Sequence, residues 1–301
     1  MAAKPKPADA ATLERLFRGV SVAIPSEDTV KKELQKPTKA LRVKLGIDPT
    51  TPDFHIGYLV VFRKLKLLQE LGHTIVLLIG GFTARFGDPT DKGEARTIRD
   101  KKEVKEAVSA FQKQYQRVLD QKKTEIRDNS EWYDKMSAEE LLKLMSDVTV
   151  AQMLERDMFR KRIADQKPIG LHEPVYPLLQ GHDSVELQST LTVIGSDQLF
   201  NENTARPLQE RAGEEPQSIL GLELLPGTDG NQKMSQSLGN AILLTDSAEE
   251  QFGKVMSIPD HAASQYALML TDLNMQEVAE ALDAKGAPAR DMKLTIAGGD
   301  C

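Results

Sequence analysis

Apolar and polar positions near the start of the chain predict a strand, a helix and a second strand in succession. Residues 41–49 (LRVKLGIDP) form a short apolar run closed by turn residues, which is typical of a strand. Residues 59–71 carry leucines and Phe62 at helical spacing, and Gly72 follows where a glycine often ends a helix. The uninterrupted apolar run at 74–81 (TIVLLIGG) is typical of a strand buried in a parallel sheet. We therefore expect a βαβ unit.

The remaining pattern is mostly helical. Helices are predicted over 10–40, over 100–122, once or twice within 136–164, and over most of 246–285. LTVIG at 191–195 predicts a third buried strand, and the polar segment 226–240, rich in Gly and Pro, predicts a loop. The fold class is therefore α/β, with a parallel sheet flanked by helices.

Composition excludes several classes of protein. The net charge of −6 argues against a protein that coats nucleic acid non-specifically. No apolar run approaches the roughly 18–20 residues that span a bilayer, so we expect no membrane association. The single cysteine, Cys301, rules out an intramolecular disulfide and a cysteine zinc site, and a cytoplasmic location fits best.

The segment HIGY, residues 55–58, lies between the first predicted strand and the helix. That position is the carboxyl edge of a parallel sheet, where α/β proteins bind ligands. The helix N-terminus would direct N–H groups and a positive dipole end at a phosphate, with His55 as a further donor. Gly57 would let a flat ligand approach the backbone. The alternative is a helix start with an incidental histidine.

The segment QKMSQS, residues 232–237, lies in the predicted polar loop. A lysine on such a loop can close over a triphosphate and follow the charge as pyrophosphate leaves. The alternative is a solvated loop with an unrelated lysine.

Together the two segments resemble the paired HxGx and KMSxS signatures of class I aminoacyl-tRNA synthetases. Similarity to the bacterial tyrosyl-tRNA synthetases extends through KLGIDPTTPDFHIGY, GGFTARFGDPTDKGEAR, NSEW, YPLLQGHDSVEL, IGSDQLFN and PGTDGNQKMSQSLGN. The resemblance implies a Rossmann-like parallel-sheet nucleotide-binding domain over 1–225, with a helical insertion near 100–165. It also implies a smaller helical C-terminal domain over 226–301, which carries the KMSKS-like loop and part of an anticodon-recognition region.

The resemblance also implies which residues bind substrates. The amino-acid site would use Lys44, Asp88, Asn129, Tyr176, Gln180, Asp183 and Gln198. The ATP site would use Gly46, Asp48, His55, Gly57, Thr83, Gly195, Asp197, Lys233, Met234 and Ser235, and the residues assisting catalysis would be His55, Tyr58, Lys92, Arg96 and Lys233.

Helical spacing supports the amino-acid site. Tyr176, Gln180 and Asp183 recur at i, i+4 and i+7, which places them on one face of a helix. Buried polar groups need partners, and a bound amino acid with an ammonium and a phenol would supply them. Asp88, Tyr176 and Gln180 resemble the ammonium-binding set, and Asp183 resembles the acceptor for the phenol hydroxyl. Lys44 could pair with Asp183 or mark a different subgroup.

The implied activity is tyrosine–tRNA ligation. ATP with Mg²⁺ would activate tyrosine to tyrosyl-adenylate, and the tyrosyl group would pass to tRNA(Tyr). The tyrosine carboxylate attacks the α-phosphate, so no covalent protein nucleophile, bound prosthetic group or protein metal cage is expected. The resemblance also implies a homodimer.

Three departures from the family pattern leave alternatives open. Tyr58 replaces the last histidine of HIGH, Gln236 replaces the second lysine of KMSKS, and we expect the chain to lack the C-terminal RNA-binding domain. Losing cationic donors near phosphates would slow activation, and losing that domain would weaken tRNA charging. The alternatives are a catalytically weakened paralogue that acts in RNA binding or regulation, and a tryptophan-specific relative.

Overall fold

The computed structural model describes residues 4–49, 53–88, 102, 109 and 114–298. In this part of the chain the sheet has the strand order β1-β6-β5-β2-β3-β4. All neighbouring strands are parallel except β1 and β6, which are antiparallel. The strands are β1 (Val20–Ile24), β2 (Arg42–Ile47), β3 (Thr74–Ile79), β4 (Thr124–Asp128), β5 (Leu191–Gly195) and β6 (Ser218–Leu222).

The predicted βαβ unit is present. It consists of β2, α3 (Gly57–Glu70) and β3, and α3 buries the apolar stripe that includes Phe62, Leu65 and Leu68. Gly72 lies two residues beyond the helix with φ +94°, a left-handed conformation that favours glycine. The predicted strand at LTVIG is β5.

The prediction that residues 10–40 are helical was wrong for the middle of the segment. The segment contains α1 (Ala10–Phe17), the edge strand β1, and α2 (Glu27–Gln35). VSVAI has β-branched residues at alternate positions, a short strand signal that the helix prediction missed, and it pairs with β6 some 200 residues later in the chain.

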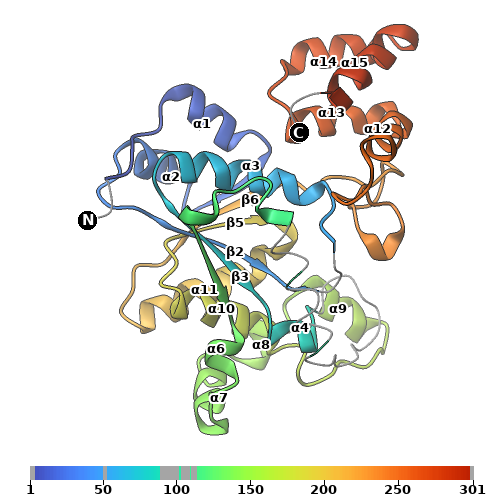
Figure 1. The fold of residues 1–301 in the computed structure, drawn as a ribbon. Helices are drawn as coiled ribbons and strands as arrows, with labels where there is room; N and C mark the ends of the chain where they lie inside the picture. Colours follow the sequence, from blue (N-terminus) through green and yellow to red (C-terminus); the bar gives the residue numbers. More distant parts are fainter. Residues whose placement is uncertain (1–3, 50–52, 89–101, 103–108, 110–113, 299–301) are drawn as a thin grey trace.

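Helices cover both faces of the sheet (Figure 1). Alternate residues of β3 point to opposite faces of the sheet. Ile75 and Leu77 belong to the main core, which α1, α2 and α3 share. Val76 and Leu78 pack on the other face with Leu187, just beyond α10. The second face is covered by α10 (Tyr176–Glu186) and α11 (Leu199–Arg211) (Figure 1). Four short helical elements lie in the loops that connect the strands and longer helices: α4 (Thr83–Phe86), η1 (Gln121–Lys123), α6 (Ser130–Tyr133) and η2 (Ser196–Gln198).

The segment predicted to hold one or two helices at 136–164 holds three. They are α7 (Ala138–Met145), α8 (Val150–Met153) and α9 (Asp157–Ala164). The helix predicted over 100–122 lies largely outside the described residues. Residues 226–240 are a loop, as predicted, with one short turn of helix, η3 (Gln236–Leu238).

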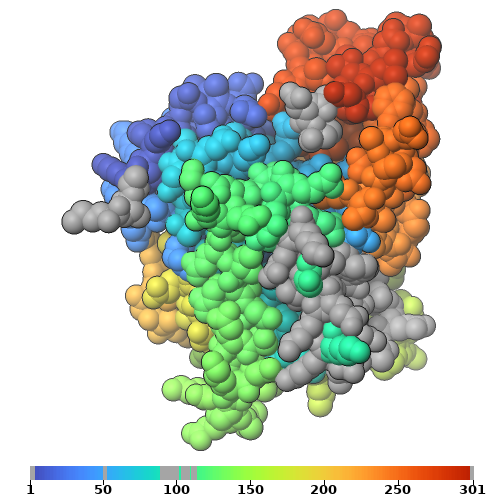
Figure 2. All heavy atoms as spheres, in the orientation of Figure 1, coloured from blue at the N-terminus to red at the C-terminus, as the bar shows by residue number. Residues whose placement is uncertain are grey.

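The last part of the chain is helical, as predicted, with α12 (Ala248–Ser257), α13 (Asp260–Leu270), α14 (Met275–Asp283) and α15 (Gly286–Gly298). Figure 2 shows α14 and α15 projecting beyond the body of the molecule. Arg18, just after α1, connects the sheet region to these C-terminal helices, because its guanidinium donates to the backbone carbonyls of Leu268 at 2.8 Å and Leu273 at 2.6 Å. The division into domains at residues 225 and 226 stays a prediction. No helix within the described ranges is long and apolar enough to cross a membrane.

Candidate active site

The candidate site lies where the order of strands reverses. From β2 the chain runs through α3 to β3 on one side, whereas β5 lies against the other side of β2. Such a reversal leaves a crevice at the carboxyl ends of the strands, which is where open α/β sheets bind ligands. Asp48 follows β2, and Gly195 and Asp197 lie at the end of β5.

One cavity of about 690 Å³ opens at this edge. Every predicted site residue that the structure describes lines it, from Lys44 on β2 to Ser235 in the polar loop. Lys92 and Arg96 lie outside the described residues. The lining residues that were predicted are Lys44, Gly46, Asp48, His55, Gly57, Tyr58, Thr83, Asp88, Asn129, Tyr176, Gln180, Asp183, Gly195, Asp197, Gln198, Lys233, Met234 and Ser235.

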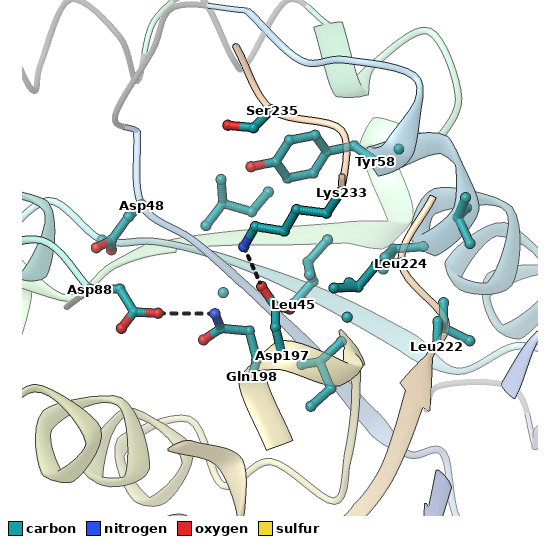
Figure 3. A pocket seen from close by; sticks show the side chains of 18 of the residues that line it. Leu45, Asp48, Tyr58, Asp88, Asp197, Gln198, Leu222, Leu224, Lys233 and Ser235 are labelled. Atoms are coloured by element: carbon teal, nitrogen blue, oxygen red, sulfur yellow. Dashed lines mark hydrogen bonds and ion pairs between the residues drawn. The ribbon is translucent and has the colours of Figure 1, made fainter. Parts of the chain in front are cut away.

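The KMSQS loop brings a cation to the mouth of the cavity. Lys233 Nζ lies 3.0 Å from Asp197 Oδ2, and Figure 3 shows Tyr58 and Ser235 beside it. Burial, together with Asp197 and Asp48, raises the pKa of Tyr58 to about 12, so its hydroxyl stays protonated. Lys233 is therefore the charged group of this cluster that can neutralise a phosphate, and Tyr58 is a neutral donor.

His55 is electrically neutral near pH 7. Burial and the nearby charge of Lys233 lower its pKa to about 4. Its Nδ1 is buried and lacks a hydrogen-bond partner within the described chain. A β-carbon on Gly57 would lie 2.8 Å from this Nδ1, so glycine is required here to make room for the imidazole. This close contact is a second reason for Gly57, besides the predicted approach of a ligand.

The predicted polar stripe is present on α10, but the protein itself already supplies its partners. The Tyr176 hydroxyl donates to Asp48 Oδ2 at 2.8 Å, and Gln180 Nε2 donates to Glu202 Oε1 at 2.8 Å. Asp183 also has protein donors. The expectation that a ligand must supply the partners was therefore wrong: a ligand would add to a network that is already ordered.

Asp183 closes the deep end of the stripe. Its side chain is buried, and it accepts hydrogen bonds from Trp132 Nε1 at 3.1 Å and Asn129 Nδ2 at 3.2 Å. Burial raises the pKa of this carboxyl to about 7, while Lys44 and the two donors oppose the rise. The buried end of the site therefore holds a hydrogen-bond acceptor whose charge changes with pH near neutrality.

A second carboxylate lies nearer the opening. Asp88 Oδ2 accepts from Gln198 Nε2 at 3.0 Å, as Figure 3 shows, and Arg156 Nη1 lies 3.6 Å from Asp88 Oδ1. Gln198 is in turn linked to Asn201, whose Nδ2 donates to the Gln198 carbonyl oxygen at 3.0 Å. Two carboxylates at separate places in one cavity can bind two polar groups of the same ligand.

Lys44 pairs with Glu202 rather than with Asp183. The two side chains are each 1% exposed, and Lys44 Nζ lies 2.9 Å from Glu202 Oε2. Lys44 is level with Val76 in the sheet and therefore points toward α10 and α11. Its Nζ also donates to Ser184 Oγ at 2.5 Å.

Sequence reasoning missed Glu202, Asn201 and Trp132. Glu202 follows Gln198 by four residues on α11, so a helical count from the SDQ motif could have found it. Trp132 follows Asn129 within the NSEW motif.

Gln236, the departure from KMSKS, also lines the cavity. Its Nε2 donates to the backbone carbonyl of Asp53 at 2.5 Å, just before HIGY. His55 also forms an isolated antiparallel bridge with Leu243, three residues beyond the polar loop. The polar loop is thus held against the start of α3.

Comparisons with known proteins agree with this geometry. Residues 35–297 match the family model for class I tRNA synthetases of the tryptophan and tyrosine type. The tyrosine–tRNA ligase of Thermotoga maritima is 45% identical over 275 residues, which is 90% of this chain and 68% of the relative. That of Carboxydothermus hydrogenoformans is 46% identical over 271 residues, 89% of this chain and 66% of the relative. The chain thus spans about two thirds of the length of these relatives.

Solved structures share the fold. A tyrosyl-tRNA synthetase from Archaeoglobus fulgidus, crystallised with L-tyrosine, superposes with a TM-score of 0.76 over 95% of this chain and 94% of its own, at 22% identity. The enzyme from Aeropyrum pernix has a TM-score of 0.75 over 95% and 90%, at 19% identity. Taken with the family model and the sequence identities, these matches show that the chain belongs to the tyrosyl-tRNA synthetase family of class I.

Proposed function

We propose that this chain activates tyrosine with ATP, forming tyrosyl-adenylate and pyrophosphate, and passes the tyrosyl group to tRNA(Tyr). The observation that carries the proposal is the convergence of every described motif residue on one cavity at the strand reversal. The named function of the relatives at 45% and 46% identity supports it.

Tyrosine would lie along α10. Its ammonium group would bind near Asp88, Tyr176 and Gln180, and its hydroxyl would donate to Asp183 at the buried end. A site built to bond a hydroxyl rejects an analogue without one by roughly 10⁴–10⁵, a range for which tyrosine enzymes are themselves the standard example. The buried Asp183 carboxylate, already aligned by Trp132 and Asn129, suits that role.

ATP would lie across the ends of β2 and β5. Lys233, now paired with Asp197, would transfer its hydrogen bond to the phosphates, which frees the Asp197 carboxylate to accept from a ribose hydroxyl. Neutral His55 and Tyr58 would donate hydrogen bonds as charge moves from the α-phosphate to the leaving pyrophosphate. The carboxylate of tyrosine attacks the α-phosphorus in line, and the bond to pyrophosphate breaks.

Magnesium would enter as part of the ATP substrate. The described residues include no cluster of three or more His, Cys, Asp or Glu side chains that could hold a metal. Magnesium usually keeps several waters and binds substrate phosphates, so we propose that ATP and water hold it.

We further propose that the chain acts as a homodimer. Four of the large apolar side chains that are exposed fall within residues 142–171, and they are Leu142, Val150, Ile163 and Leu171, which are 65%, 74%, 53% and 93% exposed. A contiguous patch of exposed apolar side chains is typical of a protein interface, and we propose that these four side chains lie at the contact between the two copies. Sedimentation of the purified chain tests this, and a monomer at all micromolar concentrations would contradict it. A cytoplasmic location stays a prediction from the sequence.

Amino-acid-dependent exchange of pyrophosphate into ATP tests the proposed activity. Tyrosine should support exchange, and tryptophan and phenylalanine should support far less. Exchange with tryptophan alone would favour the tryptophan-specific alternative. No exchange with any amino acid, by protein that is folded, would favour the weakened paralogue, for which Tyr58 and Gln236 were the sequence indications.

A further inference from the structure

Below the tyrosine site lies a buried polar network centred on Glu202. Its Oε2 lies 2.9 Å from Lys44 Nζ and accepts from Gln217 Nε2 at 2.8 Å, while its Oε1 accepts from Gln180 Nε2 at 2.8 Å. Glu202 is 1% exposed and lines the cavity. The carboxylate therefore has three protein donors and almost no contact with solvent.

The network fixes the orientation of the Gln180 amide. Its Nε2 faces Glu202, and its Oε1 accepts from Asn201 Nδ2 at 2.8 Å. An amide rotated by 180° would direct its oxygen at the Glu202 carboxylate and its nitrogen at the Asn201 donor, and both contacts would be repulsive. Gln180 therefore presents its carbonyl oxygen on the Asn201 side, where its second lone pair remains suited to an ammonium donor.

The same carboxylate binds Lys44, whose charge also acts on Asp183. The Lys44 ammonium bonds Glu202 and Ser184 Oγ, and Ser184 is the neighbour of Asp183 on α10. Asp183 is a second buried carboxyl on which the charge of Lys44 acts, so it would attract Lys44 if the charge of Glu202 were lost. The ammonium end and the phenol end of the tyrosine site thus both depend on Glu202, although Glu202 would contact neither end of the bound tyrosine.

Helix packing makes this arrangement possible. A β-carbon on Gly181 would lie 3.0 Å from the backbone nitrogen of Ala205, so glycine lets α10 approach α11 closely. That approach brings Gln180 on α10 within reach of Glu202 and Asn201 on α11.

We propose that Glu202 is a positioning residue for tyrosine: it orients the Gln180 amide toward the ammonium group and holds Lys44 off the carboxylate that receives the phenol. The inference rests on the proposed function. It deepens that function by assigning tyrosine affinity to a residue that the synthetase motifs do not include.

Glu202→Gln tests the inference in pyrophosphate exchange. The charge is lost and the replacement amide can bond Gln180 in either orientation, so the KM for tyrosine should rise about tenfold or more. The KM for ATP should stay within about twofold, because Lys233 and Asp197 lie outside the network. Glu210→Gln, an exposed carboxylate on the same helix, serves as the matched control and should leave both constants unchanged.

A paired variant separates positioning from packing. Lys44→Met combined with Glu202→Met removes both charges, and replacing a buried ion pair by apolar side chains is often tolerated. Because Gln180 loses its acceptor, the KM for tyrosine should remain raised even when thermal stability returns to the parent value. The paired variant also supplies the measurement if Glu202→Gln fails to fold.

The outcomes are distinct. An unchanged KM for tyrosine in folded Glu202→Gln, or its return to the parent value in the paired variant, would overturn the positioning role and leave the proposed function intact. Absence of tyrosine-dependent exchange in the unmodified chain would overturn the proposed function itself.

Discussion

Replacing the acid at the buried end of the tyrosine site is the most direct perturbation that the structure offers. Asp183→Asn keeps the size of the side chain and removes its charge. The ion pair of Lys44 with Glu202 is preserved, so no buried cation is left without a partner. The change therefore isolates the proposed acceptor of the phenol hydroxyl.

Two costs follow from the geometry. A hydrogen bond to a charged acceptor contributes about 1.5–3 kcal/mol, so at pH 8, above the Asp183 pKa of about 7, kcat/KM for tyrosine should fall roughly 10- to 150-fold. Asp183 now accepts from Trp132 and Asn129, one at each oxygen. An amide can accept at only one of these places, and the donor left unpaired costs about 1–3 kcal/mol of unfolding free energy, which removal of the buried charge opposes above pH 7.

Pyrophosphate exchange with tyrosine and with phenylalanine measures the first effect. Phenylalanine lacks the hydroxyl and should lose little activity. The ratio of kcat/KM for tyrosine to kcat/KM for phenylalanine should therefore fall by nearly the same factor as kcat/KM for tyrosine. Glu186→Gln, on the exposed part of α10, is the control. The reasoning fails if folded Asp183→Asn activates tyrosine within twofold of the parent, or if both amino acids lose activity equally.

The pH dependence gives an independent check. The pKa of Asp183 in the folded protein, about 7 because of burial, lies above the value of about 3.9 for an unfolded chain. Its contribution to stability is therefore complete below about pH 3.9 and is lost as the pH rises through about 7. Urea unfolding between pH 4 and 8 should show this loss, and Asp183→Asn should remove it.

Three further predictions concern the helix contacts and the histidine. The His55 pKa of about 4 lies below the unfolded value of about 6.5, so its contribution to stability is present above about pH 6.5 and lost as the pH falls through 4. An NMR titration should find the imidazole neutral at pH 5.5, and a midpoint near 6.5 would contradict this. Gly57→Ala should displace the imidazole and lower kcat of exchange about tenfold, with Gly253→Ala, where a β-carbon meets open space, as the control. Gly181→Ala should force α10 from Ala205 and lower the urea-derived unfolding free energy by about 1–3 kcal/mol; an unchanged midpoint would show that the helices yield freely.

Local sequence patterns were sufficient to predict the centre of the fold. The helical spacing of Phe62, Leu65 and Leu68 and the uninterrupted apolar run of β3 are local signals, because each element must bury one face whatever its neighbours are. The stripe Tyr176, Gln180 and Asp183 followed from the same 3.6-residue repeat. The motifs then indicated which polar residues gather at the sheet edge, and the described ones do line one cavity.

Pairings between distant segments depend on three-dimensional packing and could not be predicted from local patterns. β1 was predicted as helix although VSVAI has β-branched residues at alternate positions, and nothing local indicates that its partner is β6, some 200 residues away. The partner of Lys44 was likewise decided by three dimensions. The register of β2 directs the Lys44 side chain toward α11. A buried ammonium group needs a carboxylate partner, and the packing of α11 supplies Glu202. The local pattern of apolar residues determines which face of an element is buried. The partner of a buried charged side chain, in contrast, is whichever opposite charge the packing of distant elements brings to it.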